Sequence, residues 1–134
     1  MPSKILVADD QLHMLRLMQH TLEPEGYRVL QARDGQEMIE TALRETPDLV
    51  IMDVMMPMVD GLTALRRLKK EKTTRGIPVI ILTSSVAGLM RKEAEFSGAD
   101  LILTKPFSST LLRQEIRRLL STVQVERGPS GPPS

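Results

Sequence analysis

The chain has 134 residues, the size of one ordinary domain, and 41% of them are hydrophobic, enough for a core without disulfides or structural metal. It has no cysteine, which excludes a disulfide framework and thiolate metal sites. Its 18 basic and 17 acidic side chains leave a net charge of +1, so bulk charge does not favour nucleic acid as a partner. One tyrosine, two phenylalanines and no tryptophan supply few platforms for stacking on bases.

Short apolar runs predict the strands of a sheet. These runs occupy residues 5–8, 27–32, 49–52, 79–82 and 101–103. All but the second are apolar at consecutive positions, which is typical of strands covered on both faces of a parallel sheet. The run at 27–32 is partly polar and alternates more, so we expect it at an edge of the sheet.

Helix signals separate these runs. Asp34, followed three residues later by Glu37, predicts a capping box for a helix that ends before Pro47. Pro24 marks the end of an earlier helix, and Ser108 is the predicted N-cap of the last one. A further helix is predicted over residues 61–72. The side chains expected to face inward are Leu15, Met18, Leu22, Leu62, Leu65, Leu68, Leu112, Ile116 and Leu119.

The alternation of strands and helices predicts a three-layer α/β domain with a mostly parallel sheet and right-handed crossovers. The periodic pattern fades at Ser121, and residues 128–134 are only Gly, Pro and Ser, which cannot bury apolar surface. We therefore predict a folded domain over residues 1–121 and a disordered tail over 122–134. No apolar run approaches the ~20 residues of a membrane span, and no signal peptide is recognisable. We expect a cytoplasmic protein with no membrane association.

Acidic residues stand where two predicted strands end. Asp9 and Asp10 follow the first run, and Asp53 follows the third. In an open parallel sheet, ligands bind outside the carboxyl ends of the strands. If the first and third strands are neighbours, three carboxylates meet in one crevice and need a counter-charge. Mg²⁺ supplies it, because it prefers oxygen ligands and takes one or two carboxylates together with phosphate oxygen and water.

Two further residues complete this edge. Thr83 closes the fourth run and offers a hydroxyl, and Lys105 follows the fifth and offers a mobile charge suited to phosphate. A single acid at a strand end is usually only a polar loop residue, but a matched set favours a metal-and-phosphate site. Carboxylates, a hydroxyl and an ammonium are the groups that phosphoryl transfer uses for positioning and charge neutralisation.

At these residues the chain resembles the receiver domain of bacterial two-component response regulators. The resemblance runs from about residue 4 to residue 120. Each matching segment is a weak signal alone, but the set in this order and spacing is specific. The segments are Val7-Ala-Asp-Asp10, Val50-Ile-Met-Asp-Val-Met-Met-Pro57 with Asp60-Gly61, Val79-Ile-Ile-Leu-Thr-Ser84, and Gly98-Ala-Asp100 with Thr104-Lys-Pro-Phe107.

The resemblance implies a flavodoxin-like (βα)5 fold, a doubly wound parallel sheet with strand order 2-1-3-4-5. It implies that Asp53 is the phosphoacceptor and a metal ligand. It also implies that Asp10 binds Mg²⁺ directly, that Asp9 acts through a water molecule, and that the backbone carbonyl of Met55 is a further ligand.

The remaining implied roles concern the phosphoryl group and the partners. Lys105 would pair with the phosphoryl group, mattering for signalling more than for folding, and Thr83 would hydrogen-bond it. The donor would be a phosphohistidine of a sensor histidine kinase or a histidine phosphotransfer protein. Phosphorylation would switch a face formed by the fourth helix, fifth strand and fifth helix toward an unidentified downstream effector protein.

Such a domain is not an enzyme in the ordinary sense, because it catalyses only its own phosphoryl transfer and dephosphorylation. We expect no direct DNA binding, and a monomer or a phosphorylation-dependent dimer. Three positions depart from the usual receiver pattern. Ile102 replaces the aromatic residue that commonly acts as a switch, and Leu101 and Leu111 replace commonly acidic positions. We therefore expect a more apolar output face than usual.

Three alternatives remain. A phosphatase of the haloacid-dehalogenase type would need an Asp-x-Asp pattern after the first strand, whereas Asp9 and Asp10 are adjacent. A flavodoxin-like cofactor binder would need a phosphate-cradling loop rich in Ser, Thr or Gly at that place. A receiver that no longer takes phosphate and acts as a scaffold is disfavoured by the complete set of Asp10, Asp53, Thr83 and Lys105.

Overall fold

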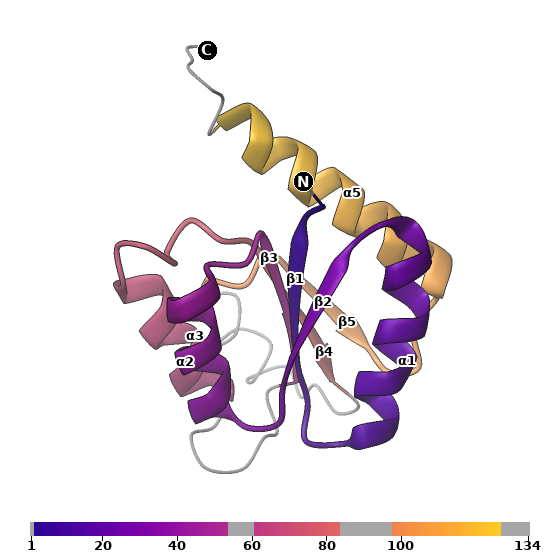
Figure 1. Cartoon of the computed structure of the whole chain (residues 1–134), viewed down its shortest axis with the longest axis horizontal. Helices are drawn as coiled ribbons and strands as arrows, with labels where there is room; N and C mark the ends of the chain where they lie inside the picture. The colour runs from indigo at the N-terminus through magenta and orange to yellow at the C-terminus, as the bar shows by residue number, and fades with distance from the viewer. Residues whose placement is uncertain (1, 54–60, 84–97, 127–134) are drawn as a thin grey trace.

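The computed structural model describes residues 2–53, 61–83 and 98–126. Within them, parallel strands form one sheet with the order β2-β1-β3-β4-β5 (Figure 1). This is the predicted strand order, and β2 lies at an edge as expected. The strands are β1 (Lys4–Ala8), β2 (Arg28–Ala32), β3 (Leu49–Met52), β4 (Val79–Thr83) and β5 (Leu101–Thr104).

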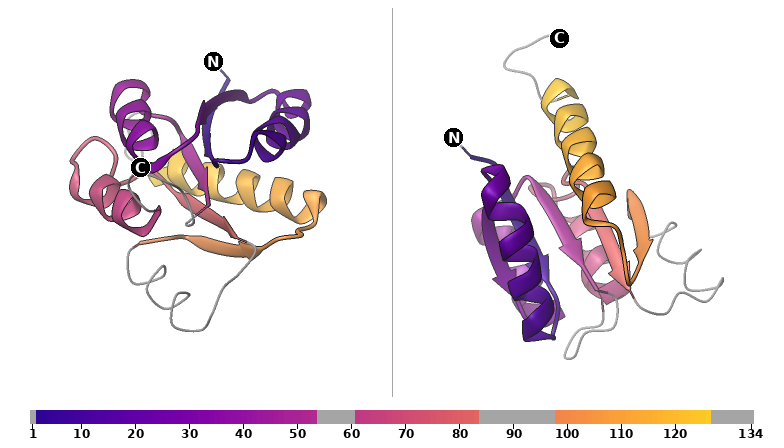
Figure 2. Two further views of the ribbon diagram at one scale, coloured as in Figure 1. Left: turned by 90° about the horizontal axis from the view of Figure 1, so that it is seen from below. Right: turned by 90° about the vertical axis from the view of Figure 1, so that its right-hand side faces the viewer.

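Helices cover both faces of the sheet. α2 and α3 lie on one face and α1 and α5 on the other, so that the domain has three layers (Figures 1 and 2). Residues 84–97, between β4 and β5, lie outside the described residues. The helical segments are α1 (Leu12–Leu22), the short 3₁₀ helix η1 (Glu23–Glu25), α2 (Gly35–Glu45), α3 (Gly61–Lys70) and α5 (Ser109–Glu126).

The predicted helix caps are present. The Asp34 carboxylate accepts a hydrogen bond from the backbone N–H of Glu37 at 2.8 Å, and the Glu37 carboxylate accepts one from the N–H of Arg33 at 2.7 Å. These bonds satisfy donors that the first turn of α2 would leave unpaired. The hydroxyl of Ser108 likewise accepts from the N–H of Leu111 at 3.2 Å. The capping residues therefore fix where these two helices begin.

The core consists of two apolar clusters separated by the sheet. Because successive side chains of a strand point to opposite faces, Leu6 and Val50 join the cluster under α2 and α3, while Ile5 and Ile51 join the cluster under α1 and α5. Both clusters are buried, as the continuous apolar runs predicted. The side chains predicted to face inward from the helices are all buried. The two-sided core holds the strands, and therefore their ends, in a fixed register.

Two boundaries differ from the prediction. α3 ends at Lys70 rather than at residue 72. The buried Thr74 explains this end, since its hydroxyl donates to the carbonyl of Leu68 at 2.7 Å and satisfies a terminal acceptor. α5 continues to Glu126, beyond residue 121. Residues 127–134 lie outside the described residues, so the predicted tail stays a prediction. In the part of the chain that is described, no helix is long and apolar enough to cross a bilayer.

Candidate functional site

The ends of β1 and β3 place Asp9 and Asp53 together. The two strands pair in parallel with Ala8 opposite Met52, so the residues that follow emerge side by side at the same edge of the sheet. The N–H of Asp53 donates to the carbonyl of Ala8 at 3.0 Å, which continues the pairing beyond β3. Both acids are buried, with 2% of Asp9 and 7% of Asp53 exposed. The predicted meeting of these two carboxylates is therefore present.

Lys105 reaches the same place from the end of β5. Its Nζ donates to Oδ2 of Asp9 at 2.9 Å and to Oδ2 of Asp53 at 3.0 Å. The Lys105 side chain is only 11% exposed, so the three charged groups form a buried cluster. The charges of these two carboxylates and one ammonium sum to −1 when all three are ionised. This imbalance favours a further cation at the site.

The protonation of Lys105 depends on its partners. Burial by itself lowers the pKa of the Lys105 ammonium, since it removes water from the charged form. The hydrogen bonds to Asp9 and Asp53 and the charges of these carboxylates act in the opposite direction and outweigh burial, so the pKa of Lys105 is raised above its ordinary value. Lys105 is therefore a permanent cation at neutral pH.

The side-chain period of the strands explains why these three residues meet. Val7 on β1, Ile51 on β3 and Leu103 on β5 all face the cluster under α1 and α5. Asp9, Asp53 and Lys105 each follow two residues later and so share that direction. Sequence reasoning placed Lys105 near a phosphoryl group but missed its bond to Asp9. The signal that could have identified this bond is that each of the three residues comes two positions after an apolar residue facing the same cluster.

The two adjacent acids have different surroundings. Asp9 is held on its second oxygen as well, because Oδ1 accepts from the N–H of Gln11 at 2.9 Å. Asp10 is exposed at the rim. Among the described residues, no group of three His, Asp or Glu side chains is close enough together to hold a metal. The structure thus brings together two of the three predicted carboxylates.

The described part of the site nevertheless fits Mg²⁺. It offers hard oxygen donors from two buried carboxylates that carry more negative charge than Lys105 neutralises, and Mg²⁺ needs only one or two carboxylates when water completes its shell. Met55, the predicted carbonyl ligand, lies outside the described residues. The backbone of Thr83 lies opposite Thr104, the residue before Lys105, which places the predicted hydroxyl residue on the same edge of the sheet.

The predicted output face is described only for β5 and α5. Ile102 is buried at 8% exposure and packs in the cluster under α2 and α3. Leu101 is partly buried and packs against the cluster under α1 and α5, so it contributes less exposed surface than expected. Leu111 on α5 is 41% exposed. The expected apolar surface therefore rests chiefly on Leu111.

Relatives of known function match most of the chain. A family model described as the response regulator receiver domain matches residues 5–117. Response regulator PleD of Caulobacter vibrioides is 40% identical over 119 residues, covering 89% of this chain and 26% of that protein. The alkaline phosphatase synthesis transcriptional regulatory protein PhoP of Bacillus subtilis is 35% identical over 132 residues, covering 93% of this chain and 51% of that protein. The chain thus spans about a quarter to a half of these relatives.

Solved structures agree with this match. The signal receiver domain of a signal transduction histidine kinase from Syntrophus aciditrophicus has a TM-score of 0.85 at 35% identity, covering 91% of this chain and 92% of that one. The receiver domain of a sensor histidine kinase from Pseudomonas aeruginosa has a TM-score of 0.84 at 27% identity, with coverages of 90% and 99%. That structure contains a magnesium ion coordinated in the active site cleft. With the fold, the buried acids at the ends of β1 and β3 and the family match in agreement, the chain belongs to the response regulator receiver domain family.

Proposed function

We propose that this receiver domain accepts a phosphoryl group on Asp53 in a reaction that requires Mg²⁺. The observation that carries the proposal is the buried pair of Asp9 and Asp53, joined through the Nζ of Lys105 at 2.9 and 3.0 Å. Such a pair of carboxylates with one cation is short of positive charge. A metal ion and a phosphoryl group would complete the charge balance of the site.

The residues of the chain would divide the work between them. A carboxylate oxygen of Asp53 forms the bond to phosphorus as the phosphorus–nitrogen bond of a phosphohistidine breaks, and the imidazole leaves with the electron pair. Mg²⁺ would be held by Asp9, Asp10 and Asp53, with the Met55 carbonyl as a further ligand, and when bound it neutralises charge on the phosphoryl oxygens. Asp9 and Lys105 keep Asp53 in place before transfer.

Lys105 and Thr83 would act on the product. The Lys105 side chain is a flexible point charge, so its ammonium can leave one carboxylate oxygen for a phosphoryl oxygen without a backbone change. Thr83, at the end of the adjacent β4, would donate its hydroxyl to the same group. Because Thr83 ends β4 and Lys105 follows the neighbouring β5, this exchange is the step that would transmit phosphorylation to the surface.

The donor would be a phosphohistidine of a sensor histidine kinase or a histidine phosphotransfer protein, and the target an effector protein. The domain would catalyse only its own phosphoryl transfer and dephosphorylation. A phosphatase of the haloacid-dehalogenase type is less well supported, since the buried acid best placed as an acceptor, Asp53, follows the third strand rather than the first. Direct DNA binding is not proposed for these residues.

The test is the intact mass of the protein after incubation with acetyl phosphate and Mg²⁺. A single phosphoryl adduct is expected, and it should be absent from Asp53→Asn and from samples with EDTA. Asp48→Asn is the matched control, because Asp48 precedes β3 and so lies at the opposite end of the same strand. It should be labelled like the original protein. An adduct that persists in Asp53→Asn, or forms fully with EDTA, would refute the assignment.

The proposed output face should make contacts through apolar rather than charged groups. Arg117 and Arg118 on α5 pair within the chain, with Glu25 at 3.5 Å and Glu115 at 2.6 Å, so they are partly occupied. Burying the exposed part of Leu111 is worth about 1 kcal/mol per copy, whereas a surface ion pair contributes ~0–1 kcal/mol and is screened by salt.

Dimerisation or effector binding after beryllofluoride activation should therefore change little from low to high salt and weaken in Leu111→Glu. Leu17→Glu is the matched control, since Leu17 is 44% exposed on α1 instead of α5. Association measured by analytical ultracentrifugation would show the difference. A steep loss with salt that is equal in both variants would mean that the contact is ionic.

A further inference from the structure

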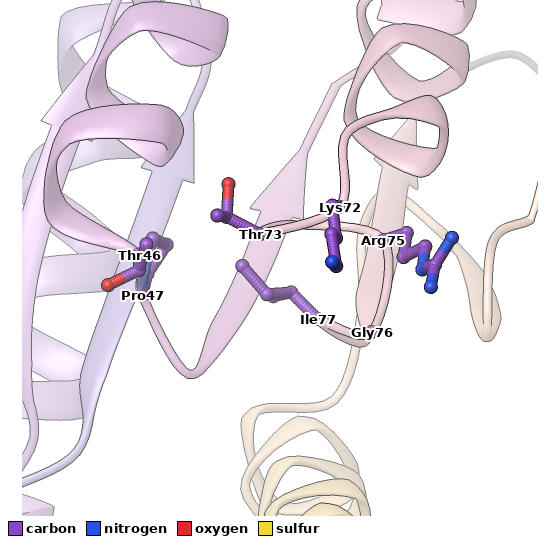
Figure 3. A pocket seen from close by; sticks show the side chains of 7 residues that line it. All are labelled: Thr46, Pro47, Lys72, Thr73, Arg75, Gly76 and Ile77. Carbon is purple, nitrogen blue, oxygen red and sulfur yellow. The ribbon is translucent and has the colours of Figure 1, made fainter.

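A pocket of about 260 Å³ lies at the end of the sheet where β3 and β4 begin, opposite the end at which Asp53 lies. Its walls are the connection from α2 to β3, at Thr46 and Pro47, and the connection from α3 to β4, at residues 72–77 (Figure 3). Both connections lead into the starts of parallel strands, whereas Asp53 follows the end of one. The pocket is therefore separate from the proposed phosphorylation site.

The loop from α3 to β4 makes this pocket positive. Lys72 and Arg75 are exposed, and no ion pair is found for either among the described residues. The acids nearest in the sequence are already engaged. Glu71 pairs with Arg67 at 3.1 Å, and Glu45 pairs with Lys4 and Arg44. An anion that entered the pocket would thus be attracted by both charges without displacing either residue from an ion pair with a described residue.

The pocket also has an apolar floor and neutral donors. Ile77 and Pro47 are buried, and Figure 3 shows the Ile77 side chain extending toward Pro47 across the gap between the two connections. In Figure 3 the Thr73 hydroxyl and the Lys72 ammonium lie on the same loop but point in different directions, while Arg75 projects to the side away from Pro47. Lys72 is therefore the main charged group of the pocket, and Arg75 adds a longer-range charge.

The space beside Gly76 is open on the side where a side chain would lie. A Cβ placed on Gly76 would meet no atom within 4 Å. Its backbone has no left-handed conformation that would make a substitution strained. A ligand, or a longer side chain at this position, can occupy the space without displacing protein atoms.

We propose that this pocket binds a small organic phosphate monoester. The dianionic phosphate would sit beside the Lys72 ammonium, since an ammonium is a compact charge well suited to phosphate. The organic part would lie over the small exposed surface of Pro47 and Ile77 and along the loop at Thr73 and Gly76. A volume of about 260 Å³ is near the lower end of small-molecule sites, which suits a metabolite-sized ligand. Binding at this place does not depend on phosphorylation of Asp53.

The first test is a titration of the ¹⁵N-labelled full chain without divalent cations, followed by amide chemical shifts. AMP and glucose 6-phosphate are the probes, with adenosine, glucose and inorganic phosphate as comparisons. Saturable shifts are expected at Thr46, Thr73 and Gly76 with both esters, none with the uncharged compounds, and several-fold weaker binding of inorganic phosphate. Shifts centred on Asp53 or spread over all basic residues, or equal affinity for inorganic phosphate, would overturn the proposal.

Two pairs of variants separate the pocket from general charge. Lys72→Glu should weaken AMP binding at least about tenfold, whereas Lys70→Glu, the same charge change at an exposed position outside the pocket, should alter it less than about twofold. Gly76→Glu should abolish binding more completely than Gly76→Gln, which has the same length without the charge. Equal effects of Lys72→Glu and Lys70→Glu would mean that the esters follow net charge alone, and the proposed site would be wrong.

Discussion

Lys105→Ala is expected to destabilise the unphosphorylated domain when no divalent cation is present. The substitution removes the ammonium that lies 2.9 Å from Asp9 and 3.0 Å from Asp53 and leaves both carboxylates in the same buried cluster. Like charges in one buried cluster repel, and each has lost most of its water. Position alone predicted that Lys105 matters for signalling more than for folding, but its two short hydrogen bonds indicate a structural role as well.

The size of the effect follows from the burial of the cluster. Removing one partner of a fully buried ion pair costs ~3–5 kcal/mol. Here Lys105 is 11% exposed and Asp9 keeps its bond from the N–H of Gln11, so we expect a loss of about 1–3 kcal/mol. For a domain of this size, this is a fall in melting temperature of roughly 3–15 °C.

The assay is thermal and urea unfolding in EDTA and in Mg²⁺, with Lys70→Ala as the exposed control. Mg²⁺ at tenfold above its dissociation constant should restore about 1.4 kcal/mol to Lys105→Ala. In an Asp53→Asn background, Lys105→Ala should cost less, because only one carboxylate charge then loses its bond to the ammonium. An unchanged melting temperature in EDTA, or an equal cost in both backgrounds, would refute the reasoning.

Three further predictions follow from local geometry. The pKa of Lys105 is raised above its ordinary 10.5, because its bonds to Asp9 and Asp53 outweigh burial, and burial raises the pKa of Tyr27 above its ordinary 10.0. For each residue, the free energy of unfolding is therefore highest while the side chain is protonated and falls as pH rises through the raised pKa. The loss of stability at alkaline pH should therefore be smaller in Lys105→Met and in Tyr27→Phe than in the original protein. Asp34→Ala should lower the free energy of unfolding, measured by urea unfolding, by ~1 kcal/mol, while Asp34→Ser should keep most of that stability. Gly98→Ala should cost at least about 1 kcal/mol, since φ is +107° and its Cβ would lie 3.0 Å from Cγ of Lys69, whereas Gly76→Ala should be neutral or slightly stabilising by the same measurement.

The layered fold could be predicted because the sequence signals are local. Apolar runs such as 49–52 have no polar position, so they require cover on both faces, and the Asp34–Glu37 pair fixes the start of α2 through bonds three residues apart. The partial burial of Leu101 could not be predicted in this way. It depends on packing against a cluster that includes residues of α1, which lies far from Leu101 in the sequence. Local pattern decides the elements, and tertiary contact decides exposure at their ends.

At the candidate site, too, local sequence pattern and tertiary contact determine different features. The acids were recognisable from the strand ends, but adjacency in sequence does not tell which of Asp9 and Asp10 turns inward. The two-residue period of β1 decides it: Val7 faces the cluster under α1 and α5, so Asp9 shares that direction and is buried, whereas Asp10 is exposed at the rim. Lys105 has the same parity on β5 and therefore bonds the inner acid. An acid at the rim keeps its water and can exchange it for a metal, while the inner acid already bonds the Lys105 ammonium, so the two positions suit different roles.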